Sequence, residues 1–383
     1  MEKKKWDKAI KLYKSLKCPK QYFDPTTITL GKMGYHWILS DRSRGKTTNV
    51  LLFGLCVYFC YNVRIEYVRQ KDKMVSPTEL MSLFDTIIHY GYIEKLTDGK
   101  FNNIKYNASY WYLCKTDENG EVEDIDSKPC MHKCCVSNNS MLKSSYNSPT
   151  SDYIVYDEVI SADGSTLVNE YVRFTDLLLT INRMRTTTEV FMLSNTLSSN
   201  SIYFREMLIT DVIKKAKQGD KYEFYNVLGT FFTIDVLSKA EDKERLKAVQ
   251  GYYCTQNSEV AGLVGNDVWS YKSFPHIPKE KFDIIECFYI ETDYKPYRID
   301  LVLTETGLKC YVHNTKLKEQ YNNIVFTLNP IQRPNEIFGI GNPNKNIWKL
   351  RKMNRWCYAD NEIGADIVFY LQNLKQKMTA LEI

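Results

Sequence analysis

One segment near the amino terminus constrains the fold more than any other part of the chain. An apolar strand at residues 35–39 and an apolar helix at residues 47–61 are joined by the polar loop Ser40-Asp41-Arg42-Ser43-Arg44-Gly45-Lys46-Thr47-Thr48. This loop has the spacing of a P-loop (Walker A motif), with Ser40 in place of the usual first glycine. A strand, loop and helix in this order predict a parallel α/β sheet with an anion site at the start of the helix.

The loop also predicts how a nucleotide would be held. Backbone N–H groups of residues 40–48 and the helix amino terminus would meet the phosphates. Lys46 would bridge the terminal phosphates and Thr47 would bind Mg²⁺, which makes ATP and Mg²⁺ the expected cofactors. A surface turn that contains Gly-Lys-Thr by chance has the same sequence, so the loop alone does not decide the function.

A second motif, of the Walker B type, decides between these interpretations. The apolar strand at residues 153–156 ends in Asp157 and Glu158, which places both acids at the carboxyl edge of the sheet, where nucleotides bind. Asp157 is expected to hold Mg²⁺ and Glu158 to polarise the attacking water. A strand that simply ends in solvated acids is common, but both motifs in this order predict nucleotide hydrolysis.

Two further features fit hydrolysis. Ser194 and Asn195 end the apolar strand at residues 190–193, where they could sense the γ-phosphate; a plain strand-to-turn ending is the alternative. Arg183 and Arg185 follow a predicted helix and could stabilise transition-state charge in a neighbouring subunit. Arginines at a helix carboxyl terminus are also favoured by the helix dipole alone.

Strand and helix patterns alternate over the first two thirds of the chain, whereas tight turns join three strands near the end. A segment rich in turn residues, 257–278, separates the two regions. Beyond the elements named above, the expected strands and helices are a strand at 63–69, a helix opening at Ser76, a hairpin of 110–114 with 133–137 around residues 117–120, helices at 168–183, 199–218 and 238–250, strands at 286–290, 298–304 and 308–313, and a helix at 365–378.

Charge and cysteine usage bound the class of protein. The 383 residues exceed one ordinary core, so two domains are expected. Residues 1–20 carry eight lysines, and residues 337–359 lack acids but contain a basic cluster with two interleaved tryptophans: Lys345, Lys349, Arg351, Lys352, Arg355, Trp348 and Trp356. These clusters could contact DNA or another anionic partner, or be solvated faces. Without a signal peptide or a membrane-length apolar run, the protein is expected to be cytosolic, with reduced thiols and no membrane partner.

One cysteine-rich stretch raises the question of a metal. Cys130, His132, Cys134 and Cys135 lie close together, with Cys114 across the predicted hairpin. Their spacing is irregular, and adjacent residues on a strand point to opposite faces. Buried thiols are therefore favoured over a structural zinc site.

Taken together, these residues resemble the DNA-packaging ATPases of φ29-type podophages, distant relatives of terminase large subunits. The resemblance rests on the P-loop with Arg42 at its third position, the Asp157-Glu158 strand, the segment Asn182-Arg183-Met184-Arg185 and the strand end Met192-Leu193-Ser194-Asn195. It implies an additional-strand (ASCE) P-loop ATPase domain with a mainly parallel sheet at 1–236, a linker at 237–274 and a small RNase H-like, vestigial nuclease domain at 275–383.

The family resemblance also implies residue roles and partners. Lys46 and Thr47 would bind phosphates and Mg²⁺, Asp157 the metal, and Glu158 would be catalytic. Arg185 best matches the family's trans-acting arginine finger, with Arg183 the alternative, and Lys71 and Lys143 match lysines that act across the subunit interface. The implied partners are double-stranded DNA, the viral portal, a homo-oligomeric ring (a pentamer in the family) and a packaging RNA, on the procapsid in the host cytoplasm.

The resemblance to large terminases raises the question of DNA cleavage. A two-metal nuclease needs converging carboxylates, and the candidates are Glu291, Asp293, Asp300, Asp360, Glu362 and Asp366. The first strand of the second domain lacks a central Asp, so no cleavage is expected. Three rival functions remain open: another P-loop machine such as a helicase or chromosome-partition ATPase, an ATP-regulated nuclease, and a nucleotide-switched scaffold.

Overall fold

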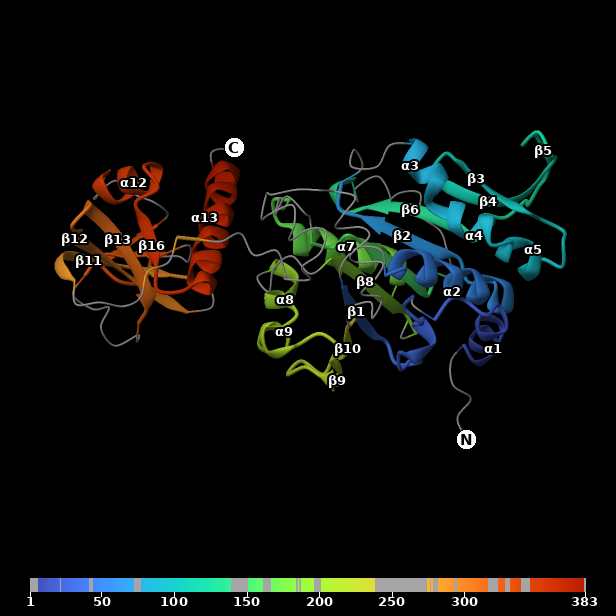
Figure 1. Ribbon diagram of the computed structural model, residues 1–383, viewed down its shortest axis with the longest axis horizontal. Helices are drawn as coiled ribbons and strands as arrows, with labels where there is room; N and C mark the ends of the chain where they lie inside the picture. Colours follow the sequence, from blue (N-terminus) through green and yellow to red (C-terminus); the bar gives the residue numbers. More distant parts are fainter. Residues whose placement is uncertain are drawn as a thin grey trace. The chain divides into compact units, whose positions relative to one another are not determined.

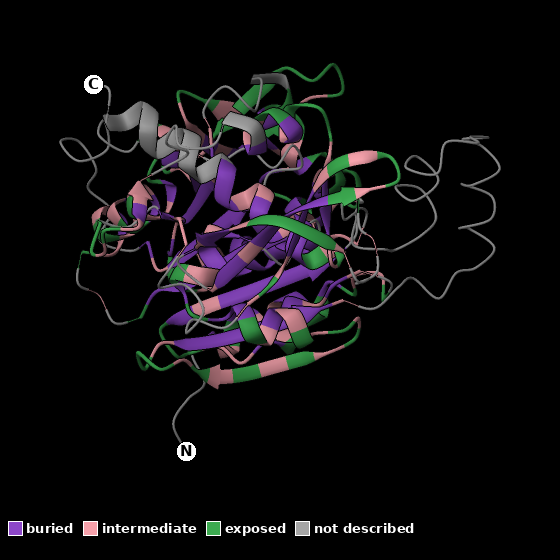
Figure 2. Cartoon of the chain, turned by 90° about the vertical axis from the view of Figure 1, so that its left-hand side faces the viewer, coloured by how far each residue is buried: buried purple, intermediate pink, exposed green. Residues whose placement is uncertain are grey.

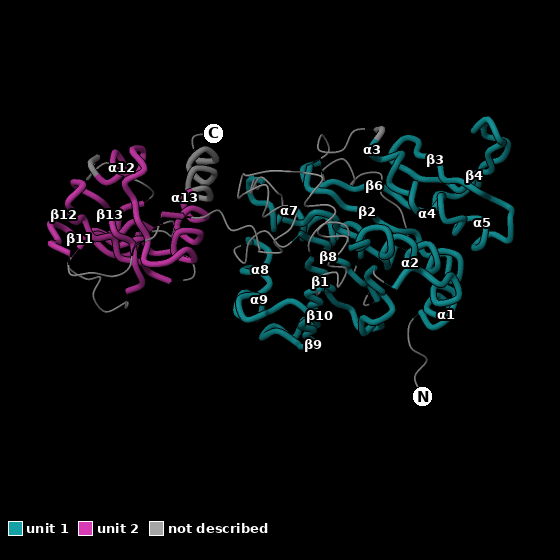
Figure 3. The backbone as a smooth tube through the Cα atoms, in the orientation of Figure 1, with its two compact units in different colours: residues 1–270 teal, residues 271–383 magenta. Residues whose placement is uncertain are grey.

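The computed structural model describes residues 6–20, 22–40, 44–71, 77–138, 151–160, 167–183, 185, 187–195, 201–237, 274–275, 277, 282–292, 295–315, 323–327, 331–338 and 345–381. The chain divides into two compact units, residues 1–270 and 271–383 (Figure 3). The linker predicted at 237–274 and the helix predicted at 238–250 lie almost entirely outside the described residues, as do Asp41, Arg42 and Ser43 of the loop.

The first unit is built on a ten-stranded, mainly parallel sheet with the order β3-β4-β6-β2-β7-β8-β1-β10-β9, and β5 pairs with β4 (Figure 1). The parallel strands are β6 (Met131–Cys135), β2 (Ile65–Arg69), β7 (Tyr153–Asp157), β8 (Glu189–Asn195), β1 (Gly34–Ser40) and β10 (Phe231–Val236). Antiparallel strands flank them: β3 (Asn103–Asn107), β4 (Tyr110–Thr116), β5 (Val122–Ile125) and β9 (Lys221–Tyr225). The predicted mixed α/β unit with a mainly parallel sheet is confirmed.

Helices cover both faces of this sheet, because its central strands are apolar on both sides. On β8, Phe191 and Leu193 pack with one cluster, and Val190 and Met192 pack with the other. The first cluster is covered by α1 (Asp7–Ser15), α2 (Lys46–Tyr61), α4 (Asp85–His89) and α5 (Tyr92–Leu96), and the second by α7 (Glu170–Asn182), α8 (Ile202–Glu206) and α9 (Thr210–Lys215). Figure 2 shows the buried residues (purple) concentrated on the central strands.

The helix that follows the P-loop is fixed firmly on the sheet. Residues 50–57 of α2 are all buried, so the helix is apolar nearly all round rather than along one stripe. Gly54 allows its close approach, because a Cβ at this position would lie 2.8 Å from side-chain atoms of Ile65 on β2 and Tyr153 on β7. The amino terminus of α2 therefore has a defined place at the sheet edge.

Two expectations for the first unit are wrong. The strand at 110–116 turns at residues 117–121 into β5, so it forms no hairpin with residues 133–137. It still pairs antiparallel with β6 through residues 110–111, while the other side of β6 pairs in parallel with β2. The helix expected at 199–218 is two short helices, α8 and α9, because the chain turns at Leu208, where φ is 57°. The turn lets Phe204 and Ile213 both reach the same core. Strands β3, β9 and β10 were not anticipated.

The second unit contains a six-stranded sheet with the order β15-β14-β11-β12-β13-β16. Its strands are β11 (Asp283–Glu291), β12 (Pro296–Thr304), β13 (Gly307–Asn314), β14 (Val325–Thr327), β15 (Glu336–Phe338) and β16 (Trp356–Tyr358). The predicted meander β11-β12-β13 is antiparallel, whereas β14, β15 and β16 join in parallel. Helices α12 (Lys345–Lys352) and α13 (Asn361–Leu381) contribute Ile347, Ile363 and Ile367 to its core.

Two properties bear on the environment of the chain. None of the ten cysteines that the structure describes forms a disulfide. In the described part of the chain, no helix combines the length and the apolar character needed to cross a membrane.

Candidate nucleotide site

The carboxyl ends of four neighbouring parallel strands form the edge at which the predicted site residues gather. In sheet order these strands are β2, β7, β8 and β1, which end in Arg69, Asp157, Asn195 and Ser40. Strand β8 lies between β1 and β7, so one strand separates the P-loop strand from the acidic strand. Because parallel strands present their carboxyl ends at one edge, polar groups from distant parts of the sequence meet there.

The described part of the loop is held by backbone geometry and by an anchor upstream. Gly45 is in the left-handed region (φ 66°), and a Cβ there would lie 2.9 Å from the ring of Tyr22, so glycine is required. The Phe23 N–H donates to the Arg44 carbonyl (3.0 Å), and Asn49 Nδ2 donates to the Phe23 carbonyl (2.6 Å). Among the described residues, the buried Arg44 Nε has no hydrogen-bond partner, which fits an anionic ligand.

Lys46 is almost completely buried and points across the strand ends. Its Nζ donates to Ser40 Oγ (2.7 Å), to the Ser40 carbonyl (3.2 Å) and to Asn195 Oδ1 (3.1 Å). Ser40, which stands where a P-loop usually has its first glycine, therefore contacts the lysine directly through its side chain and its carbonyl. Ser194 lies beside this group but is buried, and its hydroxyl donates to the Asn195 carbonyl (2.9 Å).

The first turn of α2 meets the acidic strand. Thr47 Oγ1 donates to Asp157 Oδ1 (3.1 Å), and Tyr67 on β2 donates its hydroxyl to Asp157 Oδ2 (3.0 Å). Burial and the nearby Asp157 hold the pKa of Tyr67 well above its usual value, so Tyr67 remains a donor. A hydroxyl and a carboxylate at this separation are hard oxygen ligands that fit Mg²⁺. Thr48 is half-buried in the same turn.

Glu158 is held by an arginine that sequence reasoning missed. The backbone of Glu158 is in the left-handed region (φ 53°), and its side chain is 56% exposed. Arg69 Nη2 donates to Glu158 Oε2 (2.6 Å). Arg69 Nη1 lies 3.4 Å from Asp157 Oδ2. Burial by itself would lower the pKa of Arg69, but the neighbouring Tyr67, Asp157 and Glu158 outweigh burial and raise it. The available signal was an arginine at the end of the strand predicted at 63–69.

The arginines proposed as fingers lie elsewhere. Arg185 Nε donates to Asp152 Oδ1 (2.7 Å), and its Nη2 donates to the carbonyls of Ser151 (3.0 Å) and Ile181 (2.8 Å). Asp152 precedes β7, so Arg185 lies at the opposite end of the strand from Asp157 and does not join Lys46 in the same chain. Arg183 is exposed at the end of α7. Lys71 follows β2, and Lys143 is outside the described residues.

The carboxylates of the second unit bind basic or polar partners instead of converging. Asp300 accepts from Arg298 (2.6 Å) and His313 (2.9 Å), and Asp366 accepts from Tyr297. Glu291 accepts from Arg333 (2.8 Å), and Asp360 accepts from the Ile363 N–H (2.8 Å). Among the described residues, potential metal ligands gather in a group of three only in the first unit. Asp293 lies outside the described residues.

The basic cluster of the second unit is also less uniform than its sequence suggested. Trp356 is 3% exposed and donates Nε1 to the Ile347 carbonyl (3.0 Å), and Trp348 packs on it with ring centroids 5.4 Å apart. The two tryptophans therefore belong to the core region rather than to a contact surface. Lys349 and Lys352 of α12 are exposed.

Comparison with known proteins supports the fold. No protein-family model and no curated protein matches the chain. The solved structure of the Phi-28 gp11 DNA packaging motor is similar with a TM-score of 0.57 and 17% identity, over 93% of this chain and 99% of that one. The bacteriophage Phi-29 viral genome packaging motor assembly is similar with a TM-score of 0.55 and 15% identity, over 93% of this chain and 100% of that one. Over nearly its whole length, the chain has the fold of these two packaging motors.

Proposed function

We propose that this chain is an ATP-hydrolysing motor subunit that drives double-stranded DNA through a viral portal into a preformed procapsid, in the host cytoplasm. One observation carries the proposal: Lys46, Thr47, Asp157 and Glu158 meet at one sheet edge in a fold shared with DNA packaging motors. Placement of β8 between β1 and β7 supports the additional-strand class of P-loop ATPase for residues 1–236.

The chemistry follows from the contacts at that edge. Lys46 would move from Ser40 and Asn195 to the terminal phosphates, and the Arg44 guanidinium and the loop N–H groups would bind the remaining phosphate oxygens. Thr47 and Asp157 would hold Mg²⁺, which when bound neutralises phosphate charge. Glu158 would accept a proton from the attacking water. Asn195 would contact the γ-phosphate and so link its presence to the position of β8.

The ion pair between Arg69 and Glu158 has a consequence for this step. The Glu158 oxygen that accepts from Arg69 Nη2 (2.6 Å) is occupied by this charge-assisted hydrogen bond, so Glu158 would have to turn away from Arg69 to offer that oxygen to the attacking water. Glu158 is more than half exposed, so its side chain has room to turn. A movement of strand β2 that takes Arg69 away from Glu158 would therefore release Glu158 and so control hydrolysis.

Among the described residues, the cations at this edge are Lys46, Arg44 and Arg69, and Arg69 is already paired with Asp157 and Glu158. In a homo-oligomeric ring, which we propose to be a pentamer that assembles with the portal, DNA and a packaging RNA, Arg185 of a neighbouring subunit would add a further cation for the charge that develops on the γ-phosphate. Such a role requires Arg185 to exchange its bonds with Asp152, Ser151 and Ile181 for the neighbour's phosphate. Arg183 is the alternative finger.

For residues 275–383 we propose a vestigial RNase H-like domain, joined by a linker at 237–274. The strand order β13-β12-β11-β14-β15, antiparallel in the first three strands and parallel in the rest, supports that fold. Because Asp300, Asp366 and Glu291 are engaged by Arg298, His313, Tyr297 and Arg333, we expect no nuclease activity.

The proposal is tested by ATP hydrolysis with and without DNA and procapsids. We expect DNA and procapsids to stimulate turnover of the wild-type chain. Lys46→Ala should weaken ATP binding, whereas Glu158→Gln should bind Mg-ATP normally and fail to hydrolyse it. Normal turnover by Glu158→Gln would show that the base is another residue. Wild-type protein that binds ATP without sustained turnover would instead indicate a nucleotide-switched scaffold.

A further inference from the structure

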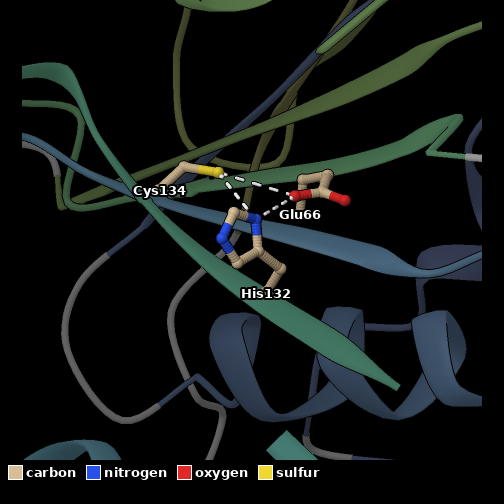
Figure 4. Close-up of side chains that lie close together, drawn as sticks. All are labelled: Glu66, His132 and Cys134. Carbon is tan, nitrogen blue, oxygen red and sulfur yellow. Dashed lines mark hydrogen bonds and ion pairs between the residues drawn. The ribbon is translucent and has the colours of Figure 1, made fainter. Parts of the chain in front are cut away.

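Three side chains of types that bind metals meet on one face of the main sheet, on two neighbouring strands. They are Glu66 on β2 and His132 and Cys134 on β6 (Figure 4). Glu66 and His132 are directly paired across the two strands, and Cys134 follows two residues later, so all three project to the same side. All three are buried, with exposures of 0%, 3% and 1%.

The donor atoms of this cluster already have nearly the spacing of a metal site. The Sγ of Cys134 lies 3.4 Å from His132 Nδ1 and 3.5 Å from Glu66 Oε2, and Nδ1 lies 2.8 Å from Oε2. With Zn–N and Zn–O near 2.0–2.2 Å and Zn–S near 2.3 Å, tetrahedral angles place such donors about 3.3–3.6 Å apart. Two of the three separations therefore match, and the third needs to open by about 0.5 Å.

Surrounding groups orient two of these ligands. Glu66 Oε1 accepts from the Arg64 guanidinium (2.9 Å) and from Ser151 Oγ (2.5 Å), which leaves Oε2 turned toward His132 and Cys134. The ring of Tyr110 stacks on the His132 imidazole, with centroids 4.5 Å apart and an interplanar angle of 23°. Fixed carboxylate and imidazole orientations are typical of the shell around bound metals.

We propose that Glu66, His132 and Cys134 form a zinc site. A thiolate, an imidazole and a carboxylate converging on one point favour Zn²⁺ over Mg²⁺ or Ca²⁺, which prefer oxygen ligands alone. One Zn²⁺ enters, the Cys134 thiol releases its proton to solvent, and neutral His132 carries its proton on Nε2 so that Nδ1 binds the metal. A fourth position is left for water or another ligand.

The site differs from the cysteine group that the sequence suggested. Cys130 packs in the cluster on the α2 side of the sheet, whereas Cys134 packs on the α7 side, so the two cannot share an ion. Glu66 replaces the missing thiol, and only the register of β2 with β6 brings it there. The zinc would join β2, which ends in Arg69 three residues after Glu66, to β6.

The test is the zinc content of the full-length chain. Protein produced with added Zn²⁺ and dialysed against zinc-free buffer should hold about one Zn²⁺ per chain by mass spectrometry, as structural sites do. Cys134→Ser should lose it. Cys135→Ser, which removes the adjacent thiol on the opposite face of the same strand, should keep it. Replacement by Co²⁺ should give a thiolate-to-cobalt absorption band in the wild type and in Cys135→Ser, and not in Cys134→Ser.

A milder variant covers the case in which Cys134→Ser fails to fold. Ser151→Ala removes a hydroxyl from Glu66 without touching the ligand set, and should weaken zinc affinity about 10- to 100-fold. Wild-type protein that is folded and zinc-free after this treatment would overturn the proposal, as would a cobalt band that survives Cys134→Ser. Unchanged zinc affinity in folded Ser151→Ala would also count against it. Zinc content and the cobalt band are both measured without ATP, so these outcomes can be read separately from the test of ATP hydrolysis.

Discussion

Glu158 and Glu291 occupy similar positions in the two sheets, but their surroundings differ. Each lies at the carboxyl end of a strand, β7 being buried throughout and β11 only at residues 288–290. Each is bound by an arginine, Glu158 by Arg69 at 2.6 Å and Glu291 by Arg333 at 2.8 Å. Near Glu158, α2 adds the lysine Lys46 and the hydroxyl of Thr47, and Asp157 at the end of the same strand adds a second carboxylate. Around Glu291, Arg333 is shared with Glu336. An acid that ends a strand beside an arginine therefore does not by itself bring a lysine, a hydroxyl and a second carboxylate together.

Strand direction explains this difference. Strands β2, β7, β8 and β1 are parallel neighbours, so their carboxyl ends share one edge. In the second unit, β11 has a parallel neighbour, β14, on one side and the antiparallel β12 on the other. The carboxyl end of β12 therefore lies at the other edge of the sheet. Asp300 on β12 is bound by Arg298 and His313. Mutations in each region can test whether this contrast also holds for function.

The largest expected effect concerns Arg185, the proposed cation from a neighbouring subunit. If Arg185 acts in a neighbouring subunit, Arg185→Ala should bind ATP normally and hydrolyse it about 10³- to 10⁵-fold more slowly. Mixing Arg185→Ala with Glu158→Gln subunits should restore part of the turnover, because some interfaces then pair an intact Arg185 with an intact Glu158. ATP hydrolysis by rings shown to contain both variants is the measurement.

Asp152→Ala is the matched control for this experiment. It removes the ion pair that Arg185 makes within its own chain but leaves the arginine available. We expect near-normal turnover with a small loss of stability. If Asp152→Ala and Arg185→Ala lose activity and thermal stability equally, and mixing gives no rescue, Arg185 is a structural residue.

The second prediction compares the two glutamates directly. Glu158→Gln should lower turnover about 10²- to 10⁴-fold, the usual range for a general base. Glu291→Gln changes a glutamate that is also paired with an arginine at a strand end, but in the sheet of the second unit. It should leave turnover within about twofold of the wild type. Steady-state hydrolysis at saturating ATP measures both. Equal losses of turnover in the two variants would show that Glu158 and Glu291 do not differ in their importance for hydrolysis.

The third prediction is that Asp300 stabilises the second unit. Burial by itself would raise the pKa of Asp300, but the bonds from His313 and Arg298 outweigh burial and lower it. Because its pKa is lower in the folded state, the Asp300 carboxylate stabilises the fold at pH values above its unfolded pKa of about 3.9. This stabilisation is lost as the pH falls through the pKa of the folded state. Asp300→Asn should lower the free energy of unfolding by about 1.5–3 kcal/mol at neutral pH.

Denaturation of Asp300→Asn and wild type at several pH values checks this, and the difference should shrink below the unfolded pKa of about 3.9. Incubation of both proteins with Mn²⁺ and plasmid DNA should give no cleavage. Cleavage by the wild type that Asp300→Asn abolishes would show that the second unit is a working nuclease, and that the contrast drawn between the two regions is wrong.

The smallest expected effects concern DNA binding by the second unit. Lys349 and Lys352 are exposed on α12, and phosphate contacts by them would depend on salt and not on sequence. Each Lys→Ala change should weaken DNA binding uniformly and reduce the slope of log affinity against log salt by about 1. Lys105→Ala, an exposed lysine outside both basic clusters, should leave the slope unchanged. Equal slopes in all variants would exclude α12 as a DNA contact.

Local sequence spacing by itself determined much of the nucleotide edge. The order of strand, loop and helix around Gly45 and Lys46, and the strand that ends in Asp157, are patterns of neighbouring residues, so they are visible without a structure. The antiparallel strands of the second unit were predictable for the same reason, because short apolar strands joined by tight turns pair with their sequence neighbours.

Tertiary structure alone decided which distant residues meet. Arg69 reaches Glu158, and Glu66 reaches His132, only because β2 lies between β6 and β7 in a specific register. Arg185 lies at the opposite end of β7 from Asp157 because the chain returns from α7 to the amino end of the sheet. Strand order and register depend on the packing of whole helices and strands, whose energy is shared among many side chains, and no short stretch of sequence carries that information.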